Sequence, residues 1–196
     1  LGIRNIEKYM RIFGFGSSTG SGVFQTENGT IPDPEWKAKV FDGEPWRLGD
    51  TYFTAIGQYG FQVAPLQALR AIASIANNGA LVEPVFVVGQ QGENKKLPLD
   101  AANLQVVREG MRQSVTDGIA KGLNVPWVKV AAKTGTAELD AGKRFVNSWV
   151  IGFFPYDHPR YAFTTVMEQG PHNNTVGSVF IMRQLFDWMK TEAPEY

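Results

Sequence analysis

The chain has 196 residues, 43% of them hydrophobic, which is enough for one globular domain with a buried core. Its 19 basic and 19 acidic residues cancel, so the net charge gives no electrostatic basis for binding nucleic acid. Cysteine is absent, which excludes disulfides and thiol catalysis, and the two histidines, His158 and His172, lack the spacing of zinc ligands, so we expect neither a metal nor a cofactor.

The first half of the chain is predicted to be mostly helical. Residues 2–15 place apolar side chains at three- and four-residue spacing, which predicts a helix. Residues 17–50 are rich in glycine, proline and polar residues and predict a long connection, in which Trp36 and Trp46 either pack against the domain or line a cleft. Residues 65–78 have the clearest helical pattern, with a proline in the first turn and an Asn-Asn-Gly stop signal.

The second half of the chain alternates predicted strands with two further helices. The strands are expected at residues 81–88, 128–138, 148–154 and 161–167, and the helices at residues 103–116 and 176–190. Helices come first and strands with antiparallel spacing gather later. This order predicts an α+β fold in which helices flank an antiparallel sheet.

The run Lys133-Thr134-Gly135-Thr136 lies where the strand predicted at 128–138 turns from apolar to polar, and it has the composition of an anion site. The lysine supplies positive charge, each threonine hydroxyl can donate a hydrogen bond, and Gly135 lets a ligand approach the backbone. A ligand carboxylate would suit such a strand end. Lys-Thr-Gly alone also arises by chance where a strand enters a turn, so its surroundings decide between the two readings.

Longer stretches around this run resemble one family. Residues 132–138 (Ala-Lys-Thr-Gly-Thr-Ala-Glu) and 147–155 (Asn-Ser-Trp-Val-Ile-Gly-Phe-Phe-Pro) resemble the third motif and following strand of penicillin-binding transpeptidases. Residues 46–51 (Trp-Arg-Leu-Gly-Asp-Thr), 56–67 (Ile-Gly-Gln-Tyr-Gly-Phe-Gln-Val-Ala-Pro-Leu-Gln) and 109–113 (Glu-Gly-Met-Arg-Gln) agree in order. Together they are similar to the C-terminal part of a class B penicillin-binding protein of the kind that serves cell elongation.

The resemblance implies a fold and a domain assignment. The α+β architecture would be the transpeptidase fold shared by penicillin-binding proteins and serine β-lactamases, of which only the C-terminal part is expected. Residues 1–196 would then all belong to one transpeptidase domain.

The resemblance also implies a nucleophile that the chain does not contain. The family uses a Ser-x-x-Lys pair and a Ser-x-Asn loop in addition to Lys-Thr-Gly. No serine in the sequence is followed by lysine three residues later or by asparagine two residues later. We therefore expect a half-site that is inactive alone, with the serine on the remainder of the transpeptidase domain.

Roles for four residues follow from the resemblance. Lys133 would sustain positive potential and assist proton transfer, and the hydroxyls of Thr134 and Thr136 would hold the carboxylate of a substrate or a β-lactam. The backbone N–H of Thr136 would form half of the oxyanion hole, with the missing serine as the other half. Gly135 would keep the strand edge open.

Two positions depart from the family pattern. Tyr59 and Gly60 stand in the reverse of the usual order, which places a bulky side chain where the family has none. Ala64 stands where a threonine N-cap is common, and its lack of a hydroxyl should cost the following helix about 1 kcal/mol.

The expected partners and location also come from the resemblance. The chain would act on D-Ala-D-Ala stem peptides of peptidoglycan, bind β-lactam antibiotics and join a cell-wall elongation complex. The sequence has no run of about 18 apolar residues and no basic leader. The location would be the periplasmic, extracytoplasmic face of the inner membrane, with an anchor outside these residues.

Other functions stay open at this point. A β-lactamase of the same fold would share Lys-Thr-Gly and hydrolyse its acyl-enzyme. A non-catalytic module that binds peptide or β-lactam fits the missing serine motifs, and a structural role in a wall-synthesis complex fits the aromatic residues of the long connection.

Overall fold

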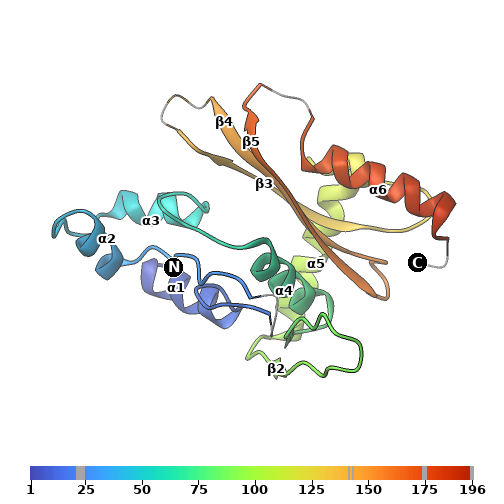
Figure 1. Cartoon of the computed structure of the whole chain (residues 1–196), viewed down its shortest axis with the longest axis horizontal. Coiled ribbons are helices and arrows are strands. Elements are labelled where there is room, and N and C mark those ends of the chain that lie inside the picture. The colour runs from blue at the N-terminus through green and yellow to red at the C-terminus, as the bar shows by residue number, and fades with distance from the viewer. Residues whose placement is uncertain (21–24, 141, 143, 174–175, 195–196) are drawn as a thin grey trace. The chain divides into compact units, whose positions relative to one another are not determined.

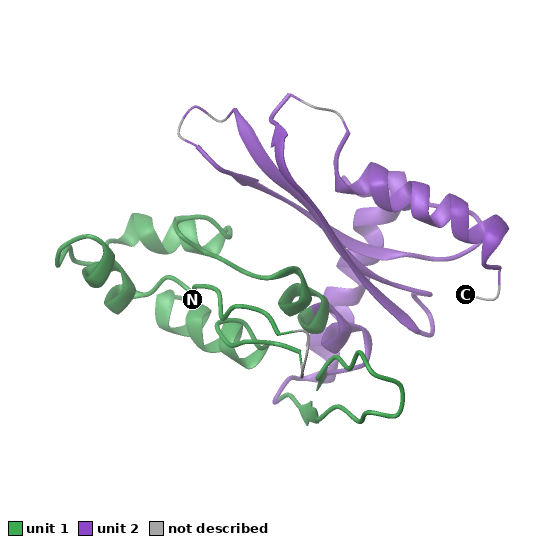
Figure 2. Ribbon diagram, viewed as in Figure 1, with its two compact units in different colours: residues 1–71, 81–97 green, residues 72–80, 98–196 purple. Residues whose placement is uncertain are grey.

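A computed structural model describes all residues except 21–24, 141, 143, 174–175 and 195–196. The chain divides into two compact units, coloured separately in Figure 2. Unit 1 comprises Leu1–Ala71 and Leu81–Leu97, and unit 2 comprises Ile72–Ala80 and Pro98–Tyr196. Among the described residues, none of the helices combines the length and the apolar character that crossing a membrane requires.

Unit 1 is built mainly of short helices. Its elements are α1 (Ile3–Ile12), α2 (Pro34–Val40), α3 (Leu48–Ala55) and the start of α4 (Pro65–Ala76), with β1 (Ala80–Val82) pairing with β2 (Asn94–Lys96). Helices α1 and α4 confirm two sequence predictions. The strand predicted at 81–88 is wrong beyond Val82, because Pro84 lacks the N–H that would continue the ladder.

Helices α2 and α3 correct the prediction that residues 17–50 form one long connection; residues 21–24 of that stretch lie outside the described part. Asp33 is the N-cap of α2, and its carboxylate accepts a hydrogen bond from the Trp36 N–H at 2.6 Å, while Pro34 occupies the first turn. At α3 the carboxylate of Asp50 accepts from the N–H of Arg47 at 2.7 Å. The prolines and glycines around both helices led to the prediction of a loop.

The aromatic residues of this region pack together. The ring of Tyr59 lies 5.7 Å from that of Trp36, 5.9 Å from Trp46 and 6.2 Å from Phe41, measured between ring centroids. The indole N–H of Trp46 donates to the hydroxyl of Thr51 at 2.8 Å. Of the two roles open to Trp36 and Trp46, the structure shows packing.

Tyr59 explains how the chain tolerates its departure from the family pattern. Its φ of 62° lies in the left-handed region, which costs a non-glycine residue roughly 1 kcal/mol or more. Contacts with three aromatic rings offset that cost. Gly60 follows at φ 77°, and a Cβ there would lie 2.5 Å from the Trp36 ring, so this turn needs glycine.

Gln67 organises the start of α4. Its side chain is fully buried; its carbonyl oxygen accepts from the N–H of Ala64 at 2.9 Å, and its amide donates to the carbonyls of Ser17 and Asn28 at 2.6 and 3.0 Å. The bond to Ala64 is the half of a capping box that a glutamine at the third helical position supplies. The stability cost expected for Ala64 stays a prediction.

Unit 2 contains a three-stranded antiparallel sheet in the order β3-β4-β5 (Figure 1). The strands are β3 (Ala131–Glu138), β4 (Phe145–Phe154) and β5 (Tyr161–Pro171), and the helices are α5 (Ala101–Thr116), the 3₁₀ turn η1 (Lys121–Leu123) and α6 (Ser178–Glu192). This arrangement confirms the predicted antiparallel sheet flanked by helices. The strand predicted at 128–138 is confirmed from Ala131 to Glu138, where β3 pairs with β4, and only its start lies three residues later than predicted.

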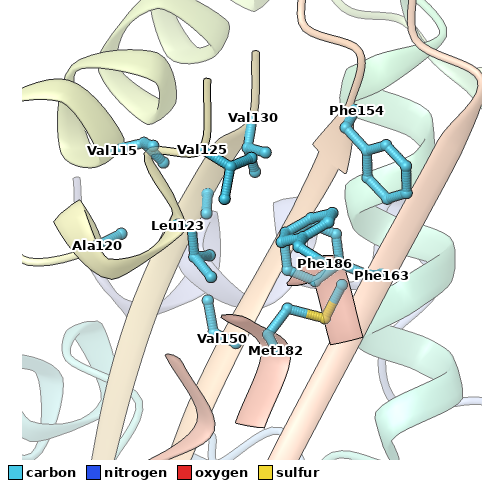
Figure 3. Packing of buried hydrophobic residues seen from close by; sticks show 11 residues of the cluster. Val115, Ala120, Leu123, Val125, Val130, Val150, Phe154, Phe163, Met182 and Phe186 are labelled. Atoms are coloured by element: carbon cyan, nitrogen blue, oxygen red, sulfur yellow. The ribbon is translucent and has the colours of Figure 1, made fainter. Parts of the chain in front are cut away.

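The core of unit 2 lies between the sheet and α6. Figure 3 shows that residues from the strands, from η1 and from α6 converge on Phe186, which is fully buried. Its ring contacts those of Phe154 and Phe163 edge to face, with centroids 5.0 and 5.8 Å away. On the opposite face of the sheet, the guanidinium of Arg108 in α5 lies 5.6 Å from the centroid of the Phe153 ring. Helices therefore pack on both faces of the sheet.

Candidate functional site

The predicted site residues lie on β3, at one edge of the sheet. Within the part of the chain that the structure describes, β3 pairs with β4 on one side and has no strand on the other. The backbone groups of an unpaired edge can bond to an extended ligand. Lys133, Thr134, Gly135 and Thr136 are thus together on a strand with one open side.

The ladder fixes the face on which each side chain stands. Thr134 pairs with Val150, whose side chain belongs to the core beneath α6, and Thr136 pairs with Ser148. Because paired residues share a face and successive residues alternate, both threonines stand on the α6 face. Lys133 pairs with Ile151 and stands on the opposite face, the one that α5 covers. The lysine and the threonines therefore flank the open edge from two sides.

The hydroxyls of this strand are accessible. Thr136 is exposed and Thr134 is half-buried, and neither hydroxyl has a hydrogen-bond partner among the described residues. Lys133 is exposed, and its ammonium donates to the carbonyl of Thr134. Two unused donors and a cation on neighbouring residues can together hold a carboxylate.

Gly135 leaves room in front of the strand. A Cβ at this position would meet only the Cβ of Trp149, at the ordinary contact distance of 3.5 Å. The packing of the chain itself therefore does not require glycine here. A bare backbone at an open edge is consistent with close approach by a ligand.

Contacts at both ends hold β3 in place. Ala131 and Ala132 are fully buried, and the guanidinium of Arg112 in α5 donates to the carbonyl of Val130 at 2.8 Å. At the hairpin, the carboxylate of Asp140 accepts from the N–H of Arg144 and of Phe145, each at 3.2 Å. Burial alone would raise the pKa of Asp140, but these backbone bonds lower it below its usual value.

The site provides binding groups and charge, but the sequence lacks the serine motifs from which the family takes its nucleophile. None of the serines has the lysine that would act as its base at the Ser-x-x-Lys spacing. Within the described residues, no group of three or more His, Cys, Asp or Glu side chains could hold a metal ion. The chemistry that these groups support is recognition of an anion and stabilisation of an oxyanion.

Comparison with known proteins defines the class. Residues 1–186 match the family described as "Penicillin binding protein transpeptidase domain". The chain belongs to this family, and both the family and the fold expected from the sequence motifs are confirmed.

Individual members of this family are similar to the chain over nearly its whole length. The chain is 29% identical to peptidoglycan D,D-transpeptidase MrdA of Acinetobacter baumannii, and the match covers 97% of this chain and 32% of that protein. It is 27% identical to MrdA of Escherichia coli K12, where the match covers 95% of this chain and 33% of that protein. The penicillin-binding protein PBP2 of Helicobacter pylori, solved in complex with MreC, superposes with a TM-score of 0.84 at 31% identity, over 99% of this chain and 37% of that one. The chain thus spans about a third of the length of the curated relatives that it matches.

Proposed function

We propose that this chain is the substrate-holding part of a serine-type peptidoglycan D,D-transpeptidase of the elongation class. Its curated relatives carry that activity in their names, and the chain matches them over 95% or more of its own length. Both compact units would belong to one transpeptidase domain, whose serine lies outside these 196 residues. The observation that carries the proposal is the pair of unpartnered threonine hydroxyls beside a lysine on an open strand edge.

Each residue of the run then has a role in acyl transfer. The serine hydroxyl attacks the carbonyl carbon of the D-Ala-D-Ala peptide bond, and the leaving D-alanine takes up a proton. The hydroxyls of Thr134 and Thr136 bind the terminal carboxylate of the substrate, or that of a β-lactam. The backbone N–H of Thr136 stabilises the oxyanion, and the ammonium of Lys133 keeps the site positive and assists proton transfer.

The proposal extends to partners and location. A cell-wall elongation complex is the proposed setting, because a similar protein was solved in complex with MreC. The stem peptide of peptidoglycan is the proposed substrate, and β-lactam antibiotics are the proposed inhibitors. The proposed location is the extracytoplasmic face of the inner membrane.

Replacing each threonine by valine in the complete transpeptidase tests the assignment. Valine keeps the shape and removes the hydroxyl, so a carboxylate loses one charge-assisted hydrogen bond worth about 1.5 to 3 kcal/mol. The second-order rate constant of acylation by a penicillin should fall roughly 10- to 150-fold in Thr134→Val and in Thr136→Val.

Thr164→Val is the matched control. The hydroxyl of Thr164 on β5 is buried and has no hydrogen-bond partner among the described atoms, so its loss should leave acylation unchanged. Wild-type acylation rates in both β3 variants would contradict the assignment of the two threonine hydroxyls to carboxylate binding. Steady turnover of a chromogenic cephalosporin by the wild-type protein would indicate a β-lactamase, and non-covalent binding alone would indicate a non-catalytic module.

A further inference from the structure

A pair of serines joins α6 to the sheet next to Thr136. The hydroxyl of Ser148 on β4 accepts from the backbone N–H of Ser178, the first residue of α6, at 3.1 Å. The two serine hydroxyls also lie 3.1 Å apart, within hydrogen-bond distance. Ser178 is fully buried. One side chain of β4 therefore satisfies a helix N–H that has no partner within the helix.

The surroundings of the pair are close-packed. A Cβ built on Gly177, the N-cap residue of α6, would lie 2.8 Å from the hydroxyl oxygen of Ser148. Gly177 has no side chain that could cap the helix, so the hydroxyl of Ser148 supplies a capping bond from outside the helix. The contact depends on a serine on the strand and a glycine before the helix.

Ser148 is also the ladder partner of Thr136. Both side chains stand on the α6 face, and β4 is the only strand that supports β3 among the described residues. A shift of β4 at Ser148 would therefore be passed to Thr136 directly. No second strand on the far side of β3 would resist it.

We propose that Ser148 is a positioning residue for the transpeptidase reaction, which anchors the start of α6 to β4 and so fixes the backbone N–H and the hydroxyl of Thr136. This inference rests on the proposed function, since it assigns Ser148 to the same site. The hydroxyl of Ser148 does not itself touch the substrate. Its loss acts by displacing Thr136, and a displacement of about 1 Å can cost 100-fold in rate.

The test compares variants of the complete transpeptidase in their reaction with a penicillin. Rates measured over a range of penicillin concentrations separate the acylation rate constant from the binding constant. Ser148→Ala should lower the acylation rate constant about 10- to 100-fold at a temperature well below the melting temperature. Ser148→Thr, which keeps the hydroxyl, should recover most of the loss.

Two controls separate positioning from a purely structural role. Thr165→Val removes another hydroxyl that faces α6, the one that donates to the sulfur of Met182 at 3.6 Å, and should leave acylation unchanged. Ser148→Ala and Ser178→Ala should be non-additive in acylation, because they remove one shared contact. If Ser148 had a merely structural role, Ser148→Ala would lower the melting temperature and leave the acylation rate constant of the folded protein at its wild-type value.

The outcomes distinguish this inference from the function on which it rests. Slow acylation in Thr136→Val together with wild-type acylation in Ser148→Ala would overturn the positioning role alone. Failure of Ser148→Thr to recover the rate would do the same. Absence of acylation in the wild-type protein, or wild-type acylation in both Thr134→Val and Thr136→Val, would overturn both.

Discussion

Gly152→Ala tests whether the packing behind β3 controls the site. Gly152 lies on β4 and pairs with Ala132 of β3, the residue that precedes Lys133. A Cβ on Gly152 would lie 2.3 Å from the backbone oxygen of Ala131 and 2.6 Å from the ring of Phe163. Real Cβ atoms essentially never approach closer than 3.0 Å, so β3 and β4 would have to separate by at least 0.7 Å.

The structure gives the size of the effect. Overpacking against a backbone atom costs about 3 kcal/mol, and alanine regains up to about 1 kcal/mol of backbone entropy, so stability should fall by about 2 kcal/mol. A shift of nearly 1 Å that begins two residues before Lys133 should also slow acylation by up to about 100-fold. Urea unfolding of the chain measures the first effect, and penicillin acylation of the complete transpeptidase measures the second.

Gly110→Ala is the control for this experiment. Gly110 lies on α5 with nothing within 4 Å of its Cβ position, so alanine should stabilise the helix by about 0.5 to 1 kcal/mol and leave acylation unchanged. A Gly152→Ala protein with wild-type stability and wild-type acylation would refute the described packing of β3 on β4.

Two further predictions concern stability. Burial alone would raise the pKa of Asp50, but the Lys37 ammonium 2.7 Å away and the N–H of Arg47 lower it below its usual value. The contribution of Asp50 to stability is therefore present above about pH 4, the ordinary pKa of an aspartate, and is lost as the pH falls through the lowered pKa. The difference in urea midpoint between wild type and Asp50→Asn should therefore shrink as the pH falls from about 6 to about 3, and a constant difference would contradict the ion pair. Phe186→Ala empties the centre of the unit 2 core and should cost about 3 to 5 kcal/mol in urea unfolding, whereas a loss below about 1 kcal/mol would mean that this ring is not buried.

The sequence was sufficient to predict those helices and strands whose residue patterns are strong. The period of α4 and its proline start predicted that helix, and short runs rich in apolar residues predicted β4 and β5. The sequence was insufficient for α2, because a helix of seven residues between prolines and glycines has too few turns to show a period. The start of β3 was predicted three residues early, because Val128 and Val130 have β-type side chains but precede the ladder with β4.

The site could be predicted only in part. Lys133, Thr134, Gly135 and Thr136 were singled out by their composition and given roles by the resemblance, and the structure brings them to one open edge. The sequence could not show that the lysine and the threonines stand on opposite faces, since that depends on the register with β4. Nor did it reveal Ser148, whose contact with α6 joins residues 30 positions apart and has no local signature.

The most direct test of the central claim is to locate the covalent adduct. The complete transpeptidase is incubated with a penicillin, its intact mass is measured, and peptide mapping identifies the modified residue. The account predicts one adduct, on a serine outside these 196 residues that is followed three positions later by lysine. An adduct on a serine of this chain, or none on a complete and folded protein, would contradict the claim that the chain holds the substrate for a serine supplied by the rest of the domain.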